Sequence, residues 1–334
     1  MSSISPNKPL SAQNSLPRRV TSSLIMGLTA SLSRVFLYTL NSVEVTGLQR
    51  FLDVQDKRKD VGKRERGLLT AADIEPHSVC NHVSVLLGAF FSAGQVLPTH
   101  RLQYSPHGGL FQPTVPQAIR LLSARPFVKS LSSSGEVGGE VNMPGLPPIY
   151  TGNRHSWVHV FPEACVHQHP KMFMRYFKWG VSRMILESEP MPDVLPIFID
   201  GTQHMMPEDR GWPRFLPRFG VKLKVAFGEL IEMEKVFGDL RARWQELVKQ
   251  EESKTQIPRV LGELSDELKY GEEAVKLRIE VAMRVREEVL KVRRSLDYPD
   301  EEPPGFELAE TWRREPRNDR YKSNVDDSVV NKRQ

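Results

Sequence analysis

The stretch SWVHVFPEA at 156–164 decides the fold of this chain, and after a polar loop RYFKWGVSR follows at 175–183. Trp157, Val158, Val160 and Phe161 are apolar, with β-branched or aromatic side chains, so this run predicts a buried strand that Pro162 ends. Glu163 then follows the carboxyl end of a strand, where open α/β sheets place their ligands. A buried turn glutamate that only ties down backbone amides fits the same spacing, so both roles stay open.

Other segments carry strand and helix patterns that together predict an α/β fold. Pro196 interrupts one apolar run, and because proline lacks an amide proton, it predicts an edge strand or a bulge there. A threonine followed by proline in the first turn favours a helix from Thr114. Near the C-terminus, acidic and basic residues recur three or four apart, as on a solvated helix. Strand patterns lie at 43–47, 194–199 and 222–227, and helix patterns at 114–122 and 240–297.

The composition suits a soluble or peripherally bound protein. The chain has 334 residues, of which 39% are hydrophobic and 26% charged, with a net charge of +5. This excess of positive charge favours an anionic partner but does not choose between nucleic acid and anionic lipid. Only Cys80 and Cys165 are present, so no disulfide framework is expected and a reducing or redox-neutral compartment is the simpler reading.

The N-terminal 43 residues contain no acidic side chain and are rich in serine. Such a composition is typical of mitochondrial targeting segments, and a disordered basic tail fits it equally well. Within it, Leu24, Leu28 and Leu32 recur at helical spacing, while Arg34 interrupts the apolar run. We expect this helix to lie in a bilayer interface, with re-entrant insertion or an amphipathic core helix as alternatives, and we predict no conventional transmembrane helix.

An ordered series of motifs resembles the glycerolipid acyltransferase superfamily. The series comprises Asn81-His82-x-Ser84, a segment that ends at Arg101, the Phe-Pro-Glu163 motif and a strand that contains Leu195-Pro196. More closely, the segments at 157–163, 177–183 and 213–220 are similar to those of the tafazzin family, and the resemblance covers about residues 20–235. It implies a mixed sheet flanked by helices, an N-terminal membrane-interacting helix and a charged helical C-terminal region.

The resemblance also implies a function. Tafazzins are CoA-independent phospholipid–lysophospholipid transacylases that remodel cardiolipin, so no cofactor is expected, and the partners would be phospholipids, lysophospholipids and a mitochondrial membrane surface. His82 would be the catalytic base. Arg101 would hold the lipid phosphate through its forked guanidinium, and Glu163 with Phe161 and Pro162 would help to bind the substrate. The structural alternatives are that His82 caps a turn and that Arg101 is an ordinary surface residue.

The chain departs from the family pattern at two positions. The superfamily pattern is His-x-x-x-x-Asp, but Leu87 stands five residues after His82, and loss of the orienting aspartate costs about 10⁴-fold in turnover in serine protease triads. The upstream carboxylates of Asp73 and Glu75 are possible substitutes. The joint after Leu86 also indicates that an internal segment is missing there. Ala164 replaces a family glycine, which adds strain of about 1–2 kcal/mol if the position needs positive φ.

Three other expectations follow from the residues. The divisions are a disordered basic N-terminus (1–20), an acyltransferase-like domain (21–235) with a flexible insert (131–153), a charged helical region (236–297) and a disordered tail (298–334). A lipid-binding homologue without catalysis is the main alternative function. A zinc site formed by Cys80, His82, Cys165, His167 and His169 lacks the usual spacing, and no nucleic-acid motif accompanies the charge.

Overall fold

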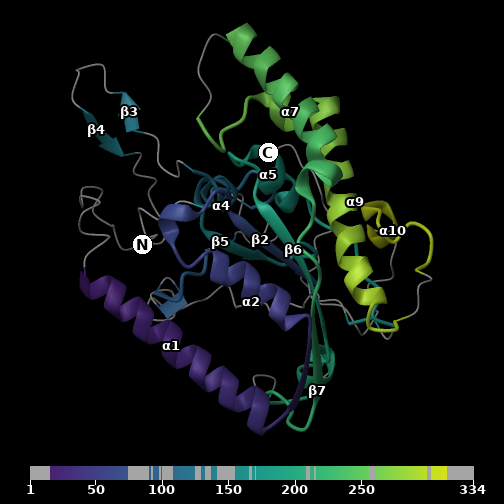
Figure 1. Cartoon of the computed structure of the whole chain (residues 1–334). Helices are drawn as coiled ribbons and strands as arrows, with labels where there is room; N and C mark the ends of the chain where they lie inside the picture. The colour runs from purple at the N-terminus through teal and green to yellow at the C-terminus, as the bar shows by residue number, and fades with distance from the viewer. Residues whose placement is uncertain are drawn as a thin grey trace.

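The protein is built on a five-stranded mixed sheet with the strand order β1-β7-β6-β2-β5 (Figure 1). The strands are β1 (Ser42–Thr46), β2 (Leu68–Asp73), β5 (Trp157–Val160), β6 (Asp193–Asp200) and β7 (Lys222–Phe227). Strands β5, β2 and β6 run parallel, while β7 is antiparallel to β6 and parallel to β1. The predicted α/β class with a mixed sheet is therefore confirmed. The computed structural model describes residues 16–73, 90–91, 93–97, 99, 108–124, 129–131, 137–140, 155–164, 168–169, 171–207, 211–213, 216–255, 260–298 and 302–313.

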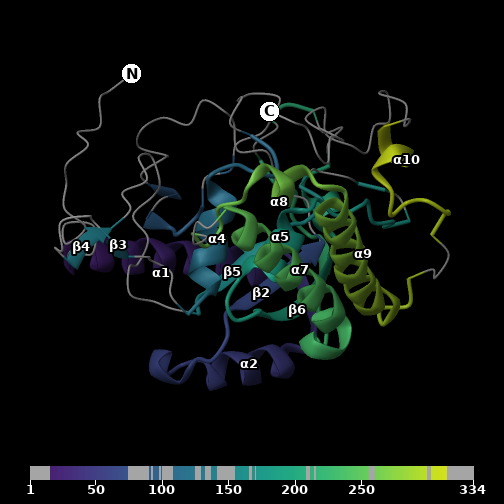
Figure 2. The ribbon, with the colours of Figure 1, turned by 90° about the horizontal axis from the view of Figure 1, so that it is seen from above.

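Helices cover both faces of the sheet (Figure 2). Helix α2 (Leu48–Lys57) lies on one face, and α4 (Thr114–Leu122), α5 (Gly180–Glu187), α7 (Met233–Thr255) and α9 (Glu272–Arg294) lie on the other. The predicted helix at 114–122 has the same bounds in the structure. The remaining elements are α1 (Leu16–Thr39), η2 (Val61–Lys63), β3 (Lys129–Leu131), β4 (Val137–Glu140), α6 (Thr202–Met205), α8 (Asp266–Tyr270) and α10 (Ala309–Arg313).

The alternation of side chains along β2 divides the hydrophobic core into two parts. Leu69 and Ala71 belong to the larger cluster beneath α4, α5, α7 and α9, because successive side chains of a strand point to opposite faces. Leu68 and Ala72 belong to the smaller cluster, against which Phe51 of α2 packs. The sheet is thus buried on both faces at its centre, as expected for parallel strands.

Pro196 does not lie in an edge strand, because β6 is central, between β7 and β2. The pairing of β6 with β7 begins only at Ile197. Before that point, the amides of Gly228 and Ile231 in the connection after β7 bind the carbonyl groups of Pro196 and Val194, at 2.9 and 3.0 Å. A residue's N–H and C=O point to the same side of a strand, so the missing donor of Pro196 faces this irregular connection and breaks no regular ladder.

Strand β5 differs from the fully buried strand that the sequence predicted. It is an edge strand, and its residues alternate between buried and exposed, with Val158 in the larger core and Trp157 50% exposed. An apolar run shows how well residues suit a sheet, but it does not tell which strand lies at the edge.

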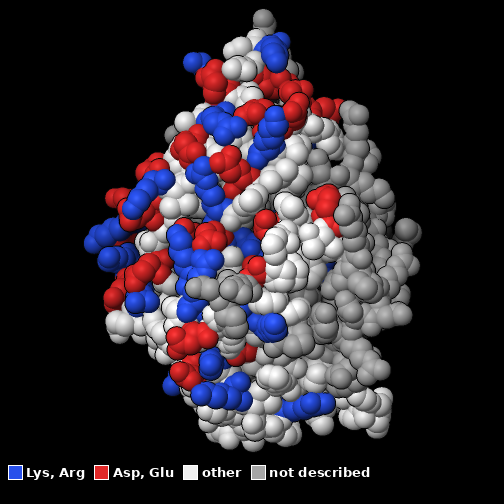
Figure 3. Space-filling view, turned by 90° about the vertical axis from the view of Figure 1, so that its right-hand side faces the viewer, with Lys and Arg blue, Asp and Glu red and all other residues white. Residues whose placement is uncertain are grey.

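The C-terminal helices share the core of the sheet. Phe237 and Trp244 of α7 and Val281 and Val285 of α9 lie in the larger cluster with the strand residues. Their outer surfaces carry interspersed acidic and basic side chains (Figure 3), including ion pairs between Arg284 and Asp239. The helical pattern predicted at 240–297 is confirmed where α7, α8 and α9 lie, and residues 256–259 fall outside the described residues. In α7 and α9 one face is charged and the other is buried.

Two stretches that were expected to be irregular contain structure. Residues 302–313, within the predicted disordered tail, pack on the protein, and Ala309 and Trp312 are buried against Tyr176. The described part of the predicted insert includes β4, which pairs with β3. The sequence patterns did not reveal these elements, because β3 and β4 are only three and four residues long and residues 302–313 are placed by contacts with Tyr176, which is distant in sequence.

Helix α1 lies along the outside of the molecule. It is long and apolar enough over Arg19–Thr39 to cross a membrane, and only 6% of that window is buried. The large apolar side chains Leu24, Leu28 and Leu32 are exposed. Within the described part of the chain α1 is not packed as a core helix, whereas interfacial and inserted arrangements both fit this exposure. The prediction that no helix could span a membrane is not confirmed, because α1 has the necessary length and composition.

Candidate functional site

A tight turn follows β5 and carries Glu163 into the protein. The amide of Ala164 binds the carbonyl oxygen of Phe161 at 3.1 Å, which closes the turn around Pro162. The amide of Lys178 binds the carbonyl oxygen of Pro162 at 2.8 Å, so the turn is joined to the segment before α5. The sequence motifs at 156–164 and 175–183 are thus in direct contact.

The Glu163 carboxylate lies buried and accepts a hydrogen bond from a backbone amide. Its Oε1 is 2.5 Å from the amide nitrogen of Arg175. A carboxylate that accepts from a backbone N–H forms a charge-assisted bond, which is stronger than a neutral one. Glu163 therefore has the amide-binding role that the sequence left open, and its role toward a substrate stays a prediction.

Ala164 occupies a backbone conformation that favours glycine. Its φ is 55°, in the left-handed region. A Cβ in this region crowds the following carbonyl oxygen and costs about 1–2 kcal/mol. Ala164, which replaces the family glycine, is therefore strained in the turn that carries Glu163.

Two arginines of α9 hold the loop that Glu163 contacts. Arg286 donates to the carbonyl oxygens of Arg175 and Met174, at 2.8 and 2.6 Å. About two turns further along the helix, Arg293 donates to the carbonyl oxygen of Met172 at 2.8 Å. Because both guanidinium groups bind backbone carbonyl oxygens of this loop, they fix the path of residues 171–175.

Residues 302–313 add a second layer to this loop. Glu302 accepts from the amide of Met174 at 3.0 Å and from Arg286 at 2.5 Å. The indole ring of Trp312 stacks with the guanidinium of Arg175, 4.5 Å from its centroid, a favourable cation–π contact. The loop beside Glu163 is therefore held from the C-terminal part of the chain on more than one side.

The motif at 175–183 ends in a structural arginine. Arg183 and Glu187 form a bidentate ion pair in α5, with distances of 2.6 and 2.8 Å, and both side chains are buried. Arg183 also donates to the carbonyl oxygens of Leu110 and Gly262. These bonds join α5 to two distant connections, so this motif residue serves the fold.

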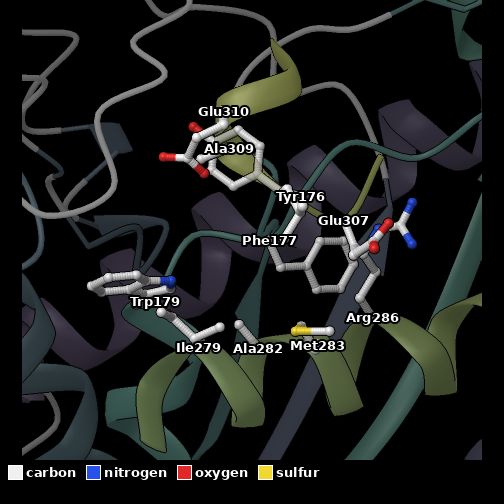
Figure 4. A pocket seen from close by; sticks show the side chains of 11 residues that line it. Tyr176, Phe177, Trp179, Ile279, Ala282, Met283, Arg286, Glu307, Ala309 and Glu310 are labelled. Atoms are coloured by element: carbon white, nitrogen blue, oxygen red, sulfur yellow. The ribbon is translucent and has the colours of Figure 1, made fainter. Parts of the chain in front are cut away.

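A pocket of about 230 Å³ lies between α9 and α10. Phe177 and Trp179 line one wall, Ile279 and Met283 of α9 line another, and Glu310 lies at its upper rim (Figure 4). The pocket adjoins the loop that Glu163 contacts through Tyr176, which follows Arg175. Its walls are mainly apolar, with carboxylates at the rim.

Only part of the predicted site falls within the described residues. Glu163, Pro162 and Phe161 are placed together in the turn after β5, and Pro162 is buried. His82 and Arg101 lie outside the described residues, as do Leu87 and Glu75, so their positions stay predictions. Asp73 ends β2. Of the five residues considered for zinc, only His169 is described, and the described part of the chain contains no cluster that could hold a metal.

His159 is a polar residue of the site region that the sequence reading did not single out. Its Nδ1 lies 2.6 Å from Oγ1 of Thr70 on the neighbouring strand, and Trp157 Nε1–H donates to the same oxygen at 2.9 Å. Solvent reaches the residue, yet the surrounding protein desolvates the ring and lowers its pKa to about 4. The period of two in residues 157–161 was the available signal, since it places His159 on the same face as Trp157.

Comparisons with known proteins give the family. No protein-family model matches the chain. The chain is similar to tafazzin of Saccharomyces cerevisiae, with 31% identity over 86% of this chain and 81% of the yeast protein. Shorter segments are similar to N-acylphosphatidylethanolamine synthase of Arabidopsis thaliana (41% identity, 24% of this chain and 28% of that protein) and to tafazzin of Drosophila melanogaster (33%, 26% and 22%). With the acyltransferase-like mixed sheet, this similarity over most of both the yeast protein and this chain shows that the chain belongs to the tafazzin family of acyltransferases.

Proposed function

We propose that this protein is a CoA-independent phospholipid–lysophospholipid transacylase that acts in cardiolipin remodelling. The observation that carries the proposal is the similarity to yeast tafazzin, which extends over most of the chain. The similarity of a shorter segment to a synthase of an N-acylated phospholipid supports a phospholipid substrate class. No cofactor is needed in this scheme, because the acyl group moves directly from one lipid to another.

In the proposed reaction, His82 removes the proton from a lysophospholipid hydroxyl. The hydroxyl oxygen attacks the ester carbonyl carbon of the donor phospholipid, the old carbon–oxygen bond breaks, and the proton passes to the departing glycerol oxygen. Arg101 holds the lipid phosphate, while Glu163, Phe161 and Pro162 bind the acceptor. The buried turn with its amide-bound carboxylate supports this last assignment, because a fixed turn presents its residues in one geometry.

Leu87 at the motif aspartate position lowers the expected turnover of this form. Without an orienting carboxylate, the imidazole of His82 lacks a partner that selects its tautomer and stabilises its protonated form. We infer that an internal segment is missing at the joint between Leu86 and Leu87, either because of alternative splicing or because of an error in the gene prediction. Sequencing of the transcript across the codons for Val85 to Ala89 tests this inference, and a continuous genomic reading frame without a skipped coding segment contradicts a gene-prediction error.

The proposed location is a mitochondrial membrane, on the intermembrane-space side, with the protein peripheral or inserted in the interface. The exposed apolar side of α1 supports this location. Trp212 is 90% exposed, and Phe219, which packs edge-on against Phe36 of α1, is also exposed. Aromatic side chains near an amphipathic helix are typical of the headgroup level of a bilayer.

Acyl exchange measured without CoA tests the proposed activity. Purified protein is mixed with cardiolipin and lysophosphatidylcholine, and acyl transfer to the labelled lysolipid is followed. We expect slow transfer that His82→Ala abolishes and that Leu87→Asp increases. Transfer that is the same in wild type and His82→Ala contradicts the proposed base, and transfer that requires acyl-CoA contradicts the reaction class.

A lipid-binding protein without catalysis is the second candidate. Leu87 at the aspartate position and the exposed side of α1 favour it. This candidate predicts binding to cardiolipin-containing liposomes that weakens as salt screens the charges, together with no acyl transfer by either wild type or Leu87→Asp. Transfer by the Leu87→Asp protein excludes it.

A further inference from the structure

Trp157, Thr70 and His159 form a hydrogen-bonded chain on the α2 face of the sheet. The parallel register of β2 and β5 pairs Thr70 with His159, so their side chains lie beside each other. Trp157 Nε1–H donates to Thr70 Oγ1 at 2.9 Å, and Thr70 Oγ1 lies 2.6 Å from His159 Nδ1. The threonine is fully buried, so its hydroxyl group must satisfy its hydrogen bonds within the protein.

The direction of these two hydrogen bonds follows from which of the atoms can donate and which can accept. The indole nitrogen can only donate, so the Thr70 oxygen accepts there, and its single proton needs an acceptor of its own. Among the described side chains, His159 Nδ1 is the acceptor within reach of that proton. Nδ1 therefore carries no hydrogen in the neutral ring, and the ring proton lies on Nε2.

The imidazole is also held on a second side. Its ring meets Phe161 edge-to-face, with centroids 4.6 Å apart and an interplanar angle of 87°. Nε2 is separated by one ring carbon from Nδ1, the atom that Thr70 binds. The residue is exposed, and Nε2 has no hydrogen-bond partner among the described residues. A fixed, uncharged N–H donor is thus presented at the sheet edge, flanked by the exposed Trp157 and by Phe161.

We propose that His159 is a substrate-binding residue whose Nε2–H donates to an oxygen of a glycerolipid, either the ester carbonyl or the phosphate. The identity of the ligand rests on the proposed function, whereas the tautomer does not. A neutral donor between aromatic side chains suits the boundary between headgroup and acyl chain, where polar oxygen atoms lie beside apolar groups. His159 precedes Glu163 by four residues, so this donor and the proposed acceptor-binding turn belong to one end of one strand.

The tautomer is tested first, by nitrogen NMR of the full-length protein labelled at histidine in detergent micelles. His159→Gln identifies the resonances of this ring. We expect a bare Nδ1 and a protonated Nε2 at pH 7.5. Thr70→Val, which removes the hydroxyl group at nearly constant shape, should abolish this preference, while Thr46→Val at the other edge of the sheet should leave it unchanged. A protonated Nδ1 in the wild type overturns the proposal.

The ligand is tested in the same samples with separate probes. Monoacylglycerol carries an ester and no phosphate, glycerol 3-phosphate carries a phosphate and no ester, and lysophosphatidylcholine carries both. We expect lysophosphatidylcholine and one of the two simpler probes to shift the Nε2–H resonance, and the responding probe identifies the oxygen. His159→Ala should weaken the binding of that probe about five-fold, as for one neutral hydrogen bond. A resonance that responds to no probe overturns the ligand assignment.

The outcome for His159 and the outcome for the proposed function are distinguishable. A lipid-dependent shift at His159 in a protein that transfers no acyl group supports the binding residue and contradicts the transacylase. If the wild type transfers acyl groups and His159→Ala has the same KM and kcat, the result contradicts only the assignment of His159 as a binding residue. In both cases, a near-normal urea midpoint of each variant verifies that it is folded.

Discussion

Glu163 Oε1 lies 2.5 Å from the amide nitrogen of Arg175, and this bond ties the turn after β5 to the loop beneath α9. Both residues are buried. A carboxylate in this position fixes the distance between two sequence motifs that are separated by a polar loop. The structural role of Glu163 is therefore measurable independently of any catalytic role.

Removal of the Glu163 acceptor should lower the free energy of unfolding. Glu163→Ala leaves the buried amide of Arg175 without its acceptor, at a cost of about 1–3 kcal/mol. Glu163→Gln retains an acceptor oxygen, so its loss should be about 1 kcal/mol, the difference between a charged and a neutral bond. Urea unfolding measures both. Glu252→Ala, at an exposed position of α7, is the control and should change stability by less than about 0.5 kcal/mol. Equal losses for the alanine and glutamine variants contradict the amide-binding role.

Ala164→Gly should stabilise the protein. At φ 55°, glycine avoids the strain of about 1–2 kcal/mol but adds about 0.5–1 kcal/mol of unfolded-state entropy. We expect a net gain of about 0.5–1 kcal/mol in urea unfolding. The same substitution at Ala30, within α1, should not stabilise, because glycine is unfavourable in a helix interior. A loss of stability for Ala164→Gly contradicts the strained conformation.

Arg286→Met should loosen the loop at 171–175. The substitution removes the donors to the carbonyl oxygens of Arg175 and Met174 and leaves the largely buried Glu302 carboxylate without this partner. We expect a stability loss of about 3–5 kcal/mol, as for other broken buried ion pairs, and faster hydrogen exchange of the Arg175 amide. Arg294→Met removes a solvent-exposed ion pair of the same helix and is the matched control. An unchanged hydrogen-exchange rate of the Arg175 amide in Arg286→Met would falsify the proposal that Arg286 holds this loop.

Leu28→Glu should weaken membrane binding through α1. Leu28 is exposed on the side of the helix that also carries Leu24 and Leu32. Charge on this side opposes burial in a bilayer interface, so flotation with cardiolipin-containing liposomes should fall several-fold. Ser33→Glu places the same charge on the opposite side of the helix and should have the smaller effect. Equal effects of the two substitutions contradict an interfacial orientation.

His159 should make stability depend on pH in the acidic range. Its folded-state pKa is lowered from 6.5 to about 4, so between these values the unfolded chain binds more protons than the folded one. The contribution is complete above pH 6.5 and is lost as the pH falls toward 4. The stability of the wild type relative to His159→Gln should therefore decrease between pH 7.5 and pH 4.5. A stability difference between wild type and His159→Gln that is the same at pH 7.5 and pH 4.5 in urea unfolding contradicts the lowered pKa of the ring.

Local patterns were enough to predict most elements of the sheet layer. The helix at Thr114–Leu122 and the strands β6 and β7 lie where periodicity placed them, because each side chain's burial follows from its own position in a helix or strand. The same patterns did not predict that Pro196 lies in a central strand or that β5 is an edge, since both depend on strands distant in sequence.

The surroundings of Glu163 were less accessible to sequence reasoning. The spacing placed it after a strand, but its amide partner comes from a polar loop without periodicity. Arg286 resembles any charged residue of a solvated helix, and Glu302 lies within the stretch that the sequence predicted to be a disordered tail. Their importance arises from contacts with backbone groups, which leave no sequence pattern. His159 was quoted within its motif, yet only the neighbouring Thr70 reveals that its ring is fixed.

The loop beside Glu163 takes its supports from the far end of the chain, since Met174 is bound by Arg286 and Glu302, 112 and 128 residues later. Ribosomes deliver a polypeptide from its N-terminus, so the strands emerge well before these supports. Closure of this region is consequently a late event in maturation. A premature stop codon between the codons for Phe227 and Glu302 would yield a product that possesses every strand of the five-stranded sheet and still lacks part of what holds its Phe-Pro-Glu turn.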